Sequence, residues 1–171
     1  MWNKRASTVP LPGGAAALAA RIGMEMRDAD EATIRVVTAL AGLLAAVAYA
    51  DRDYSEDEEA RVRLELGRIA GMTPAGIDAI CVTLREHVVE ISTVEAPRYC
   101  RALLELGDRE LRVEVLEALT ELAATDGAIT TLETNWLRQV TKALGLTQDD
   151  YNSAQAKHRE RLSVLSSPGR S

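Results

Sequence analysis

Apolar residues recur at intervals of three and four along most of the chain, which is the spacing of one face of an α-helix. Capping residues, prolines and glycines divide this pattern into eight predicted helices. Their approximate ranges are 14–27, 31–51, 55–71, 74–88, 93–107, 108–122, 130–145 and 148 onward. No window alternates apolar and polar residues convincingly enough to predict a β-strand. The sequence therefore predicts an all-α fold, a compact bundle of about seven to eight helices.

The apolar stripes also predict the core. In the predicted seventh helix the stripe is Leu132, Trp136, Val140 and Leu144. Across the chain we expect burial of Leu44, Val47, Leu66, Ile69, Leu119, Leu122, Trp136 and Val140. The most apolar run holds 15 residues between Arg35 and Asp51, whereas a bilayer span needs about 20. We therefore expect a helix that is buried nearly all round, and no transmembrane segment.

Two stretches of the chain are similar to each other. Residues 50–58 align with 125–133 so that both acidic residues keep one offset (126 − 51 = 75 and 133 − 58 = 75), and residues 62–73 align with 136–147 at an offset of 74. The repeat predicts two halves, about 31–90 and 106–162, packed around a pseudo-two-fold axis in one domain of residues 13–165. Residues 1–12 and 166–171 are rich in Ser, Pro and Gly, so we expect a flexible leader and a flexible tail.

Each copy of the repeat contains an acidic turn between two helices, and its Glu has a structural explanation. Ser55-x-x-Glu58 and Thr130-x-x-Glu133 both fit the capping box, in which the hydroxyl accepts a backbone N–H and the Glu reaches back to the cap residue. A cap of this kind stabilises a helix by about 1 kcal/mol and needs no ligand.

The Asp of each turn is harder to explain by capping. Asp51 and Asp126 follow the last turn of a helix, where the macrodipole disfavours a carboxylate. An Asx turn could account for one of them. Both together indicate that something positive is held there, either a side chain such as Arg52 or a metal ion. Gly127 suits the left-handed conformation that often ends a helix, whereas Arg52 would cost about 1–2 kcal/mol in that conformation. We therefore expect the two turns not to be equivalent.

The candidate metal ligands are one Asp and one Glu from each turn: Asp51, Glu58, Asp126 and Glu133. Oxygen ligands favour a hard divalent cation, calcium or magnesium. The second turn does not complete an EF-hand, because Ala124 and Leu122 occupy the positions where that loop needs oxygen ligands. Any such site would have to be assembled from both turns.

Composition restricts the function further. A net charge of −6 argues against nucleic-acid binding and favours cations or basic partners. Cys81 and Cys100 form no CxxC pair, so we expect two buried free thiols in a reducing cytoplasm. His87 and His158 lie in helical stretches, and no potential nucleophile stands at a spacing that would pair it with either histidine. We therefore expect no enzymatic activity. A metal-dependent hydrolase that uses the carboxylates is the alternative.

The second turn and its surroundings carry a family resemblance. An apolar helix ends in Ala123-x-x-Asp126-Gly127-x-Ile129-Thr130-x-x-Glu133, the next helix closes on residues 144–147, and a degenerate copy precedes them at residues 48–58. This arrangement resembles the TerB-like family of tellurite-resistance proteins over about residues 30–160. The resemblance implies about seven helices with pseudo-two-fold symmetry, no known catalytic activity and a cation-binding acidic surface. It also implies a role in stress and tellurium-oxyanion resistance near the inner membrane, beside calcium-binding and membrane-spanning partners.

The chain departs from the family pattern in its first turn. Arg52 stands where the family favours Gly, and Asp53, Glu56, Asp57 and Glu59 are additional acids. The leading hypothesis is a non-enzymatic cytoplasmic accessory protein, peripheral to the inner membrane, with a weak divalent-cation site made by both turns. The rival is a protein–protein interaction module in which the acidic residues only cap helices.

Overall fold

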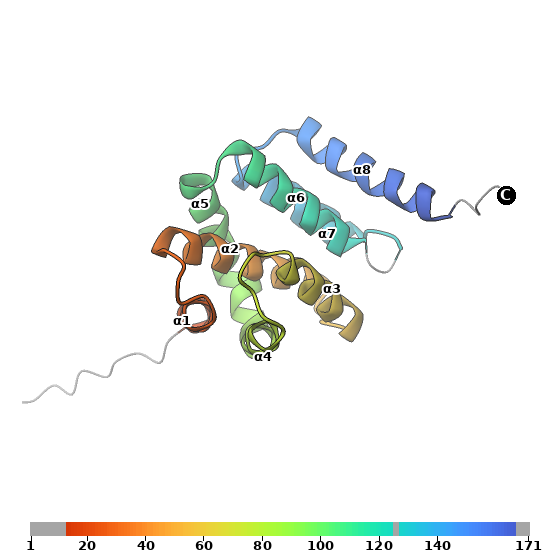
Figure 1. Ribbon diagram of the computed structural model, residues 1–171. Helices are drawn as coiled ribbons and strands as arrows, with labels where there is room; N and C mark the ends of the chain where they lie inside the picture. The colour runs from red at the N-terminus through yellow and green to blue at the C-terminus, as the bar shows by residue number, and fades with distance from the viewer. Residues whose placement is uncertain (1–12, 125–126, 167–171) are drawn as a thin grey trace, which may run out of the picture.

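The computed structural model describes residues 13–124 and 127–166, with side chains up to residue 160. These residues form eight α-helices and one π-helical turn, and no strand is present among them. The elements are α1 (Gly14–Glu25), α2 (Glu31–Ala48), α3 (Glu56–Gly67), α4 (Pro74–Glu90), η1 (Ile91–Glu95), α5 (Ala96–Leu106), α6 (Arg109–Ala123), α7 (Thr131–Ala143) and α8 (Gln148–Ser166) (Figure 1). The all-α prediction is confirmed. The predicted leader and residues 167–171 of the predicted tail lie outside the described residues.

Helix α2 is the centre of the fold. It begins at Asp30, whose carboxylate accepts a hydrogen bond of 2.7 Å from the Thr33 backbone N–H. It contacts α1, α3, α4, η1, α5, α6 and α7, and 61% of its residues are buried. By length and composition it could cross a membrane, but burial among its neighbours accounts for its apolar sequence. The prediction of a helix buried within the protein is confirmed.

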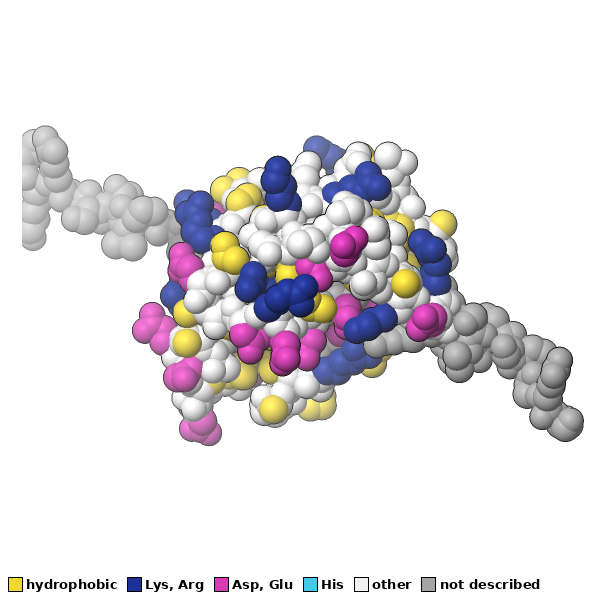
Figure 2. Space-filling model, turned by 90° about the horizontal axis from the view of Figure 1, so that it is seen from above, with side chains coloured by type: hydrophobic (Ala, Val, Ile, Leu, Met, Phe, Trp, Pro, Cys, Tyr) yellow, Lys and Arg dark blue, Asp and Glu magenta, His cyan; other side chains and the backbone are white. Residues whose placement is uncertain are grey.

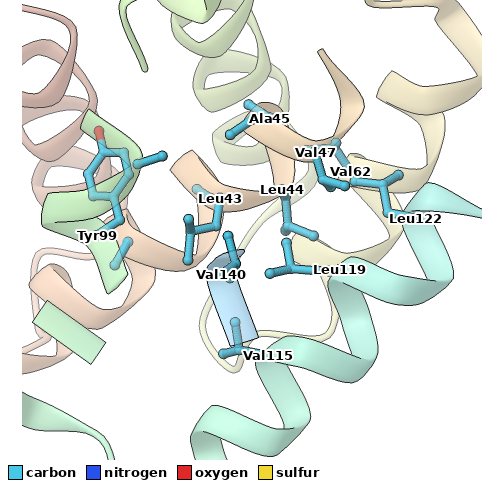
Figure 3. Close-up of a cluster of buried hydrophobic side chains, with 14 of the residues drawn as sticks. Leu43, Leu44, Ala45, Val47, Val62, Tyr99, Val115, Leu119, Leu122 and Val140 are labelled. Atoms are coloured by element: carbon cyan, nitrogen blue, oxygen red, sulfur yellow. The ribbon is translucent and has the colours of Figure 1, made fainter. Parts of the chain in front are cut away.

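The two hairpins, α2–α3 and α6–α7, pack against each other through the core. Figure 3 places Leu119 beside Leu44, and Leu122 beside Val47 and Val62. Higher residue numbers on α6 therefore meet higher numbers on α2, so the two helices run in the same direction (Figure 1). As a result, both hairpin turns leave the core at the same end of the molecule. The pseudo-two-fold relation between the halves stays a prediction.

Six of the eight predicted core residues are buried, but Ile69 and Trp136 are only half-buried. The predicted stripe of α7 is wrong at its start, because Leu132 is 59% exposed and Leu137 is fully buried. The cause is Glu133, which turns inward to cap the helix and takes the inward position at that turn. The buried face of α7 is thus displaced by one residue in its first half, whereas Val140 and Leu144 are buried as predicted.

The predicted break between the fourth and fifth helices is also wrong. The chain passes from α4 through η1 into α5 without leaving a helical conformation. Pro97, which suggested a helix start, lies in the first turn of α5. A proline inside a helix removes one hydrogen bond and clashes with the carbonyl four residues earlier, and the wider π-helical turn before it accommodates the change.

The two cysteines are free and buried, as predicted. Burial raises the pKa of the Cys81 thiol and of the Cys100 thiol to about 11. Both thiols therefore stay protonated near neutral pH, where they serve as small apolar core residues.

The surface carries charges of both signs. On the face shown in Figure 2, Lys and Arg side chains are spread widely, whereas several Asp and Glu side chains gather along one edge. The net charge of −6 is therefore distributed unevenly over the surface. A surface lined mainly by charges of one sign attracts ligands or partners of the opposite charge.

Candidate functional site

The first acidic turn follows the end of α2 at Ala48. Within it, the Asp51 carboxylate accepts a hydrogen bond of 3.0 Å from the Asp53 backbone N–H, which makes an Asx turn. Arg52 has a φ of 67° and is the one non-glycine residue with positive φ in the part of the chain that the structure describes. Its backbone N–H donates to the Tyr49 carbonyl at 2.9 Å. The turn therefore holds an arginine in the left-handed conformation, which costs an L-amino acid about 1–2 kcal/mol.

The capping box of the first turn is formed as predicted. The Ser55 backbone N–H donates to Oε2 of Glu58 at 2.9 Å, and the Glu58 backbone N–H donates to the Ser55 hydroxyl at 3.2 Å. Glu58 is only 4% exposed. The glutamate is therefore a buried structural residue at the start of α3, whatever else its carboxylate contacts.

The second turn repeats this arrangement. The Thr130 backbone N–H donates to Oε2 of Glu133 at 2.7 Å, and the Glu133 backbone N–H donates to the Thr130 hydroxyl at 3.2 Å. Glu133 is 5% exposed. Gly127 has a φ of 96° and donates its N–H to the Ala124 carbonyl at 3.0 Å. The two turns thus match in their caps and in the left-handed residue after each aspartate position.

The structure describes three of the four predicted metal ligands. Asp51 and Glu58 lie on the first turn and Glu133 on the second, while Asp126 lies outside the described residues. Among the described residues, no group of three or more His, Cys, Asp or Glu side chains is placed to hold a metal ion. The four-carboxylate site remains a prediction, because one of its four ligands is not described.

An ion-pair cluster beside the first turn was missed by the sequence interpretation. Glu59 accepts hydrogen bonds from Arg63 at 3.0 Å and from Nε of Arg85 at 2.9 Å, and Arg63 also pairs with Asp78. Burial raises the pKa of the Glu59 carboxyl, but the hydrogen bonds from both arginines outweigh burial and hold that pKa below its ordinary value. The Arg85 guanidinium also lies 4.9 Å from the centre of the Tyr54 ring.

This cluster changes the interpretation of the additional acids in the first turn. Glu59 is neutralised by the chain's own cations and is therefore a poor candidate for a metal ligand. The spacing of four between Glu59 and Arg63 is a signal that the sequence does contain. Arg85 lies on α4, 26 residues from Glu59, and no local pattern predicts its contact.

Together, the fold and the two turns define an all-helical protein built on two hairpins, each with a capped acidic turn. The family model for the tellurite resistance protein TerB matches residues 37–156, well over half of the chain, so the chain belongs to the TerB family. No curated protein and no solved structure matches the chain.

Proposed function

We propose that this protein is a non-enzymatic accessory protein of a tellurite-resistance-type stress response, and that its two acidic turns together bind a divalent cation weakly. Calcium or magnesium is the expected ion, because the candidate ligands are all carboxylate oxygens. The proposed location is the cytoplasm, peripheral to the inner membrane, beside protein partners. Membership of the TerB family supports the stress-response role.

The observation that carries the cation proposal is that both acidic turns leave the core at one end of the molecule (Figure 1). In the first turn Asp51 follows the end of α2, where the macrodipole alone disfavours a carboxylate, and the sequence has Asp126 at the matching position after α6. The first turn also keeps Arg52 at a strained φ of 67°, and strain of this kind is concentrated at functional sites. In the second turn, capping engages Oε2 of Glu133, and a carboxylate has two oxygens and about four lone-pair positions.

The test is a thermal melt of the full chain with calcium, magnesium, manganese or zinc. Exposed oxygen-ligand sites bind with dissociation constants from tens of micromolar to millimolar. At a hundredfold excess over that constant, binding adds about 2.7 kcal/mol to the free energy of unfolding. For a chain of this size the melting temperature then rises by roughly 5–10 °C.

The matched variants separate this site from general attraction to an acidic protein. Asp51→Asn/Asp126→Asn should remove the rise in melting temperature, whereas Asp28→Asn/Asp149→Asn, with the same net charge, should keep it. The rise should also decline below about pH 4, where the carboxylates are protonated. A wild-type protein that responds to none of the four ions, or two double variants that respond equally, would refute the cation site.

The second candidate function is a protein–protein interaction module that needs no cation. Its support is that local hydrogen bonds already explain three of the four carboxylates: the two capping boxes engage Glu58 and Glu133, and the Asx turn engages Asp51. Under this alternative, the melting temperature does not respond to divalent cations, and the functional surface lies elsewhere on the molecule.

A further inference from the structure

A groove of about 350 Å³ is lined by residues of α6, by the C-terminal end of α3 with the two residues after it, and by Leu40 of α2. Its apolar lining comes from all three helical segments: Leu40, Ile69, Leu111, Val115 and Ala118. Only Val115 among these is fully buried, so the groove exposes apolar surface that the fold itself does not cover. Exposed apolar surface in a groove with polar edges is typical of a docking site.

The groove is elongated. Its lining on α6 extends from Leu111 to Glu121, ten residues later, which is about 15 Å at 1.5 Å per residue. That length corresponds to almost three helical turns. An open groove of this length fits a helix laid along it better than a compact small molecule, which proteins usually enclose on most sides.

The edges of the groove are acidic. Four glutamates line it, Glu65, Glu114, Glu117 and Glu121, together with one cation, Arg68. Lys157 on α8 reaches in and pairs with Glu117. Four acids against two cations leave a net charge of −2 (2 − 4) along the groove.

Arg68 partly compensates this charge but is loosely held. Its guanidinium lies 3.2 Å from the Glu65 carboxylate and 3.9 Å from that of Glu121. Its side chain is nevertheless 59% exposed, whereas the side chains of the two glutamates are 8% and 13% exposed. An exposed arginine over two largely buried carboxylates can move aside when another cation takes its place, because exposed ion pairs contribute little to stability.

We propose that this groove docks a basic amphipathic helix of a partner protein. Apolar residues on one face of that helix cover Leu40, Ile69 and Leu111, and Lys or Arg residues beside that face reach the glutamates at the edges. Such a helix is complementary to the groove in both charge and apolar pattern. Anionic lipids and nucleic acids are repelled by the same glutamates.

This inference rests on the proposed protein partners, which both candidate functions include, and names the surface that binds one of them. The groove shares no residue with the four candidate metal ligands. The two proposals can therefore fail separately.

The test uses the full chain and a fluorescent synthetic peptide of about 18 residues, or five helical turns, with leucines on one face and lysines elsewhere. Fluorescence anisotropy measures its dissociation constant. Glu114→Gln/Glu117→Gln should weaken binding at least about tenfold, because it removes two charges from the groove edge. The matched variant Glu86→Gln/Glu110→Gln removes two exposed charges outside the lining and should bind within about twofold of wild type.

Two further measurements test the apolar part and the identity of the occupant. Ala118→Trp fills the groove without changing its charge and should also weaken peptide binding, with the fold checked by circular dichroism. A second peptide with glutamates in place of the lysines should not bind. Sedimentation of the protein alone tests for a second copy in the groove.

Three outcomes would overturn the proposal: equal weakening by the two double variants, equal binding of the acidic peptide, or a dimer that only the groove variants dissociate. The groove variants are also melted with divalent cations. If divalent cations raise the melting temperature of the groove variants as much as that of wild type, while the variants bind the peptide more weakly, then the cation site and the docking groove both stand and are independent. If wild type shows no cation response but the peptide results hold, only the cation site fails.

Discussion

Gly42 lies in the middle of α2, where the ring of Tyr99 from α5 packs directly against the backbone (Figure 3). A Cβ atom at this position would lie 2.6 Å from Cδ2 and 2.8 Å from Cζ of the ring. Gly23 in α1 provides a contrast, because the nearest atom to its Cβ would be Cδ1 of Ile34 at 4.0 Å. The same change, Gly→Ala, should therefore have opposite effects at the two positions.

The magnitudes follow from two opposing contributions. Replacing Gly by Ala inside a helix stabilises a protein by about 0.5–1 kcal/mol, and at Gly23 nothing opposes that gain. At Gly42 the ring must move by about 1 Å to restore an ordinary carbon–carbon contact of about 3.5–4.0 Å. Tyr99 is 5% exposed, so it has little room to move, and overpacking of this kind costs about 1–3 kcal/mol. Because Cε2 of the ring would lie closer still than Cδ2, the cost is at the upper end of this range, and after the gain is subtracted we expect Gly42→Ala to lose about 2 kcal/mol overall.

Urea titration measures both effects. With a slope of about 2 kcal/mol per molar urea, the unfolding midpoint should fall by about 1 M for Gly42→Ala and rise slightly for Gly23→Ala. In a Tyr99→Leu background, Gly42→Ala should cost much less, since the atoms that it meets are gone. If Gly42→Ala raised the midpoint as much as Gly23→Ala does, the close packing of α5 on α2 would be wrong.

Five other substitutions test the caps, the core, the strained turn and the ion pairs. Arg52→Gly should raise the free energy of unfolding by about 0.5–1 kcal/mol, because glycine relieves the left-handed strain. Gly127→Ala should lower it by about 1–2 kcal/mol. If both substitutions shifted the urea midpoint in the same direction, this account of the turns would be contradicted. Leu119→Ala should cost about 2–5 kcal/mol, and a midpoint shift equivalent to less than about 0.5 kcal/mol would show that this face of α6 is not in the core. Thr130→Ala should cost about 1 kcal/mol in chelator-treated protein, so an unchanged midpoint there would refute the capping account. Because the pKa of Glu59 is lowered in the folded state, its ion pairs stabilise the fold above its ordinary pKa of 4.5 and that stability is lost as the pH falls further. Glu59→Gln should make unfolding midpoints less dependent on pH between neutrality and about pH 3.5, and an unchanged pH profile would count against the ion pairs.

Features set by neighbouring residues could be predicted from the sequence. Both capping boxes were predicted, because Ser55 and Thr130 stand three residues before a Glu and the hydrogen bonds close within one turn. The left-handed residue of the second turn could be predicted too, because Gly127 suits that conformation. The expectation that Arg52 makes the first turn different is wrong at this position, because Arg52 adopts the left-handed conformation despite its cost. Helix periodicity likewise identified α2 as the buried helix, because its apolar residues cover nearly the whole circumference.

Features that depend on contacts between distant segments could not be predicted. The Arg85 contact with Glu59 joins two helices, and sequence spacing contains no information about it. The groove between α3 and α6 arises from how three helices meet, although each of its glutamates was visible in the sequence. The burial of Leu137 in place of Leu132 results from competition between a cap and an apolar side chain for one inward position.

The π-helical turn η1 sets the rotational phase between α4 and α5. An α-helix advances by about 100° per residue, and a π-helical turn contains one extra residue relative to an α-helical turn. If the five residues Ile91–Glu95 wound as an ordinary α-helix instead, the extra residue would rotate all of α5 by about 100° relative to α4. Tyr99 and Leu103 would then leave the face that packs on α2. A one-residue deletion within this segment would remove the extra residue and keep the phase of α5, so it should be less damaging than a one-residue deletion inside α4 or α5, which would rotate the face that packs on α2.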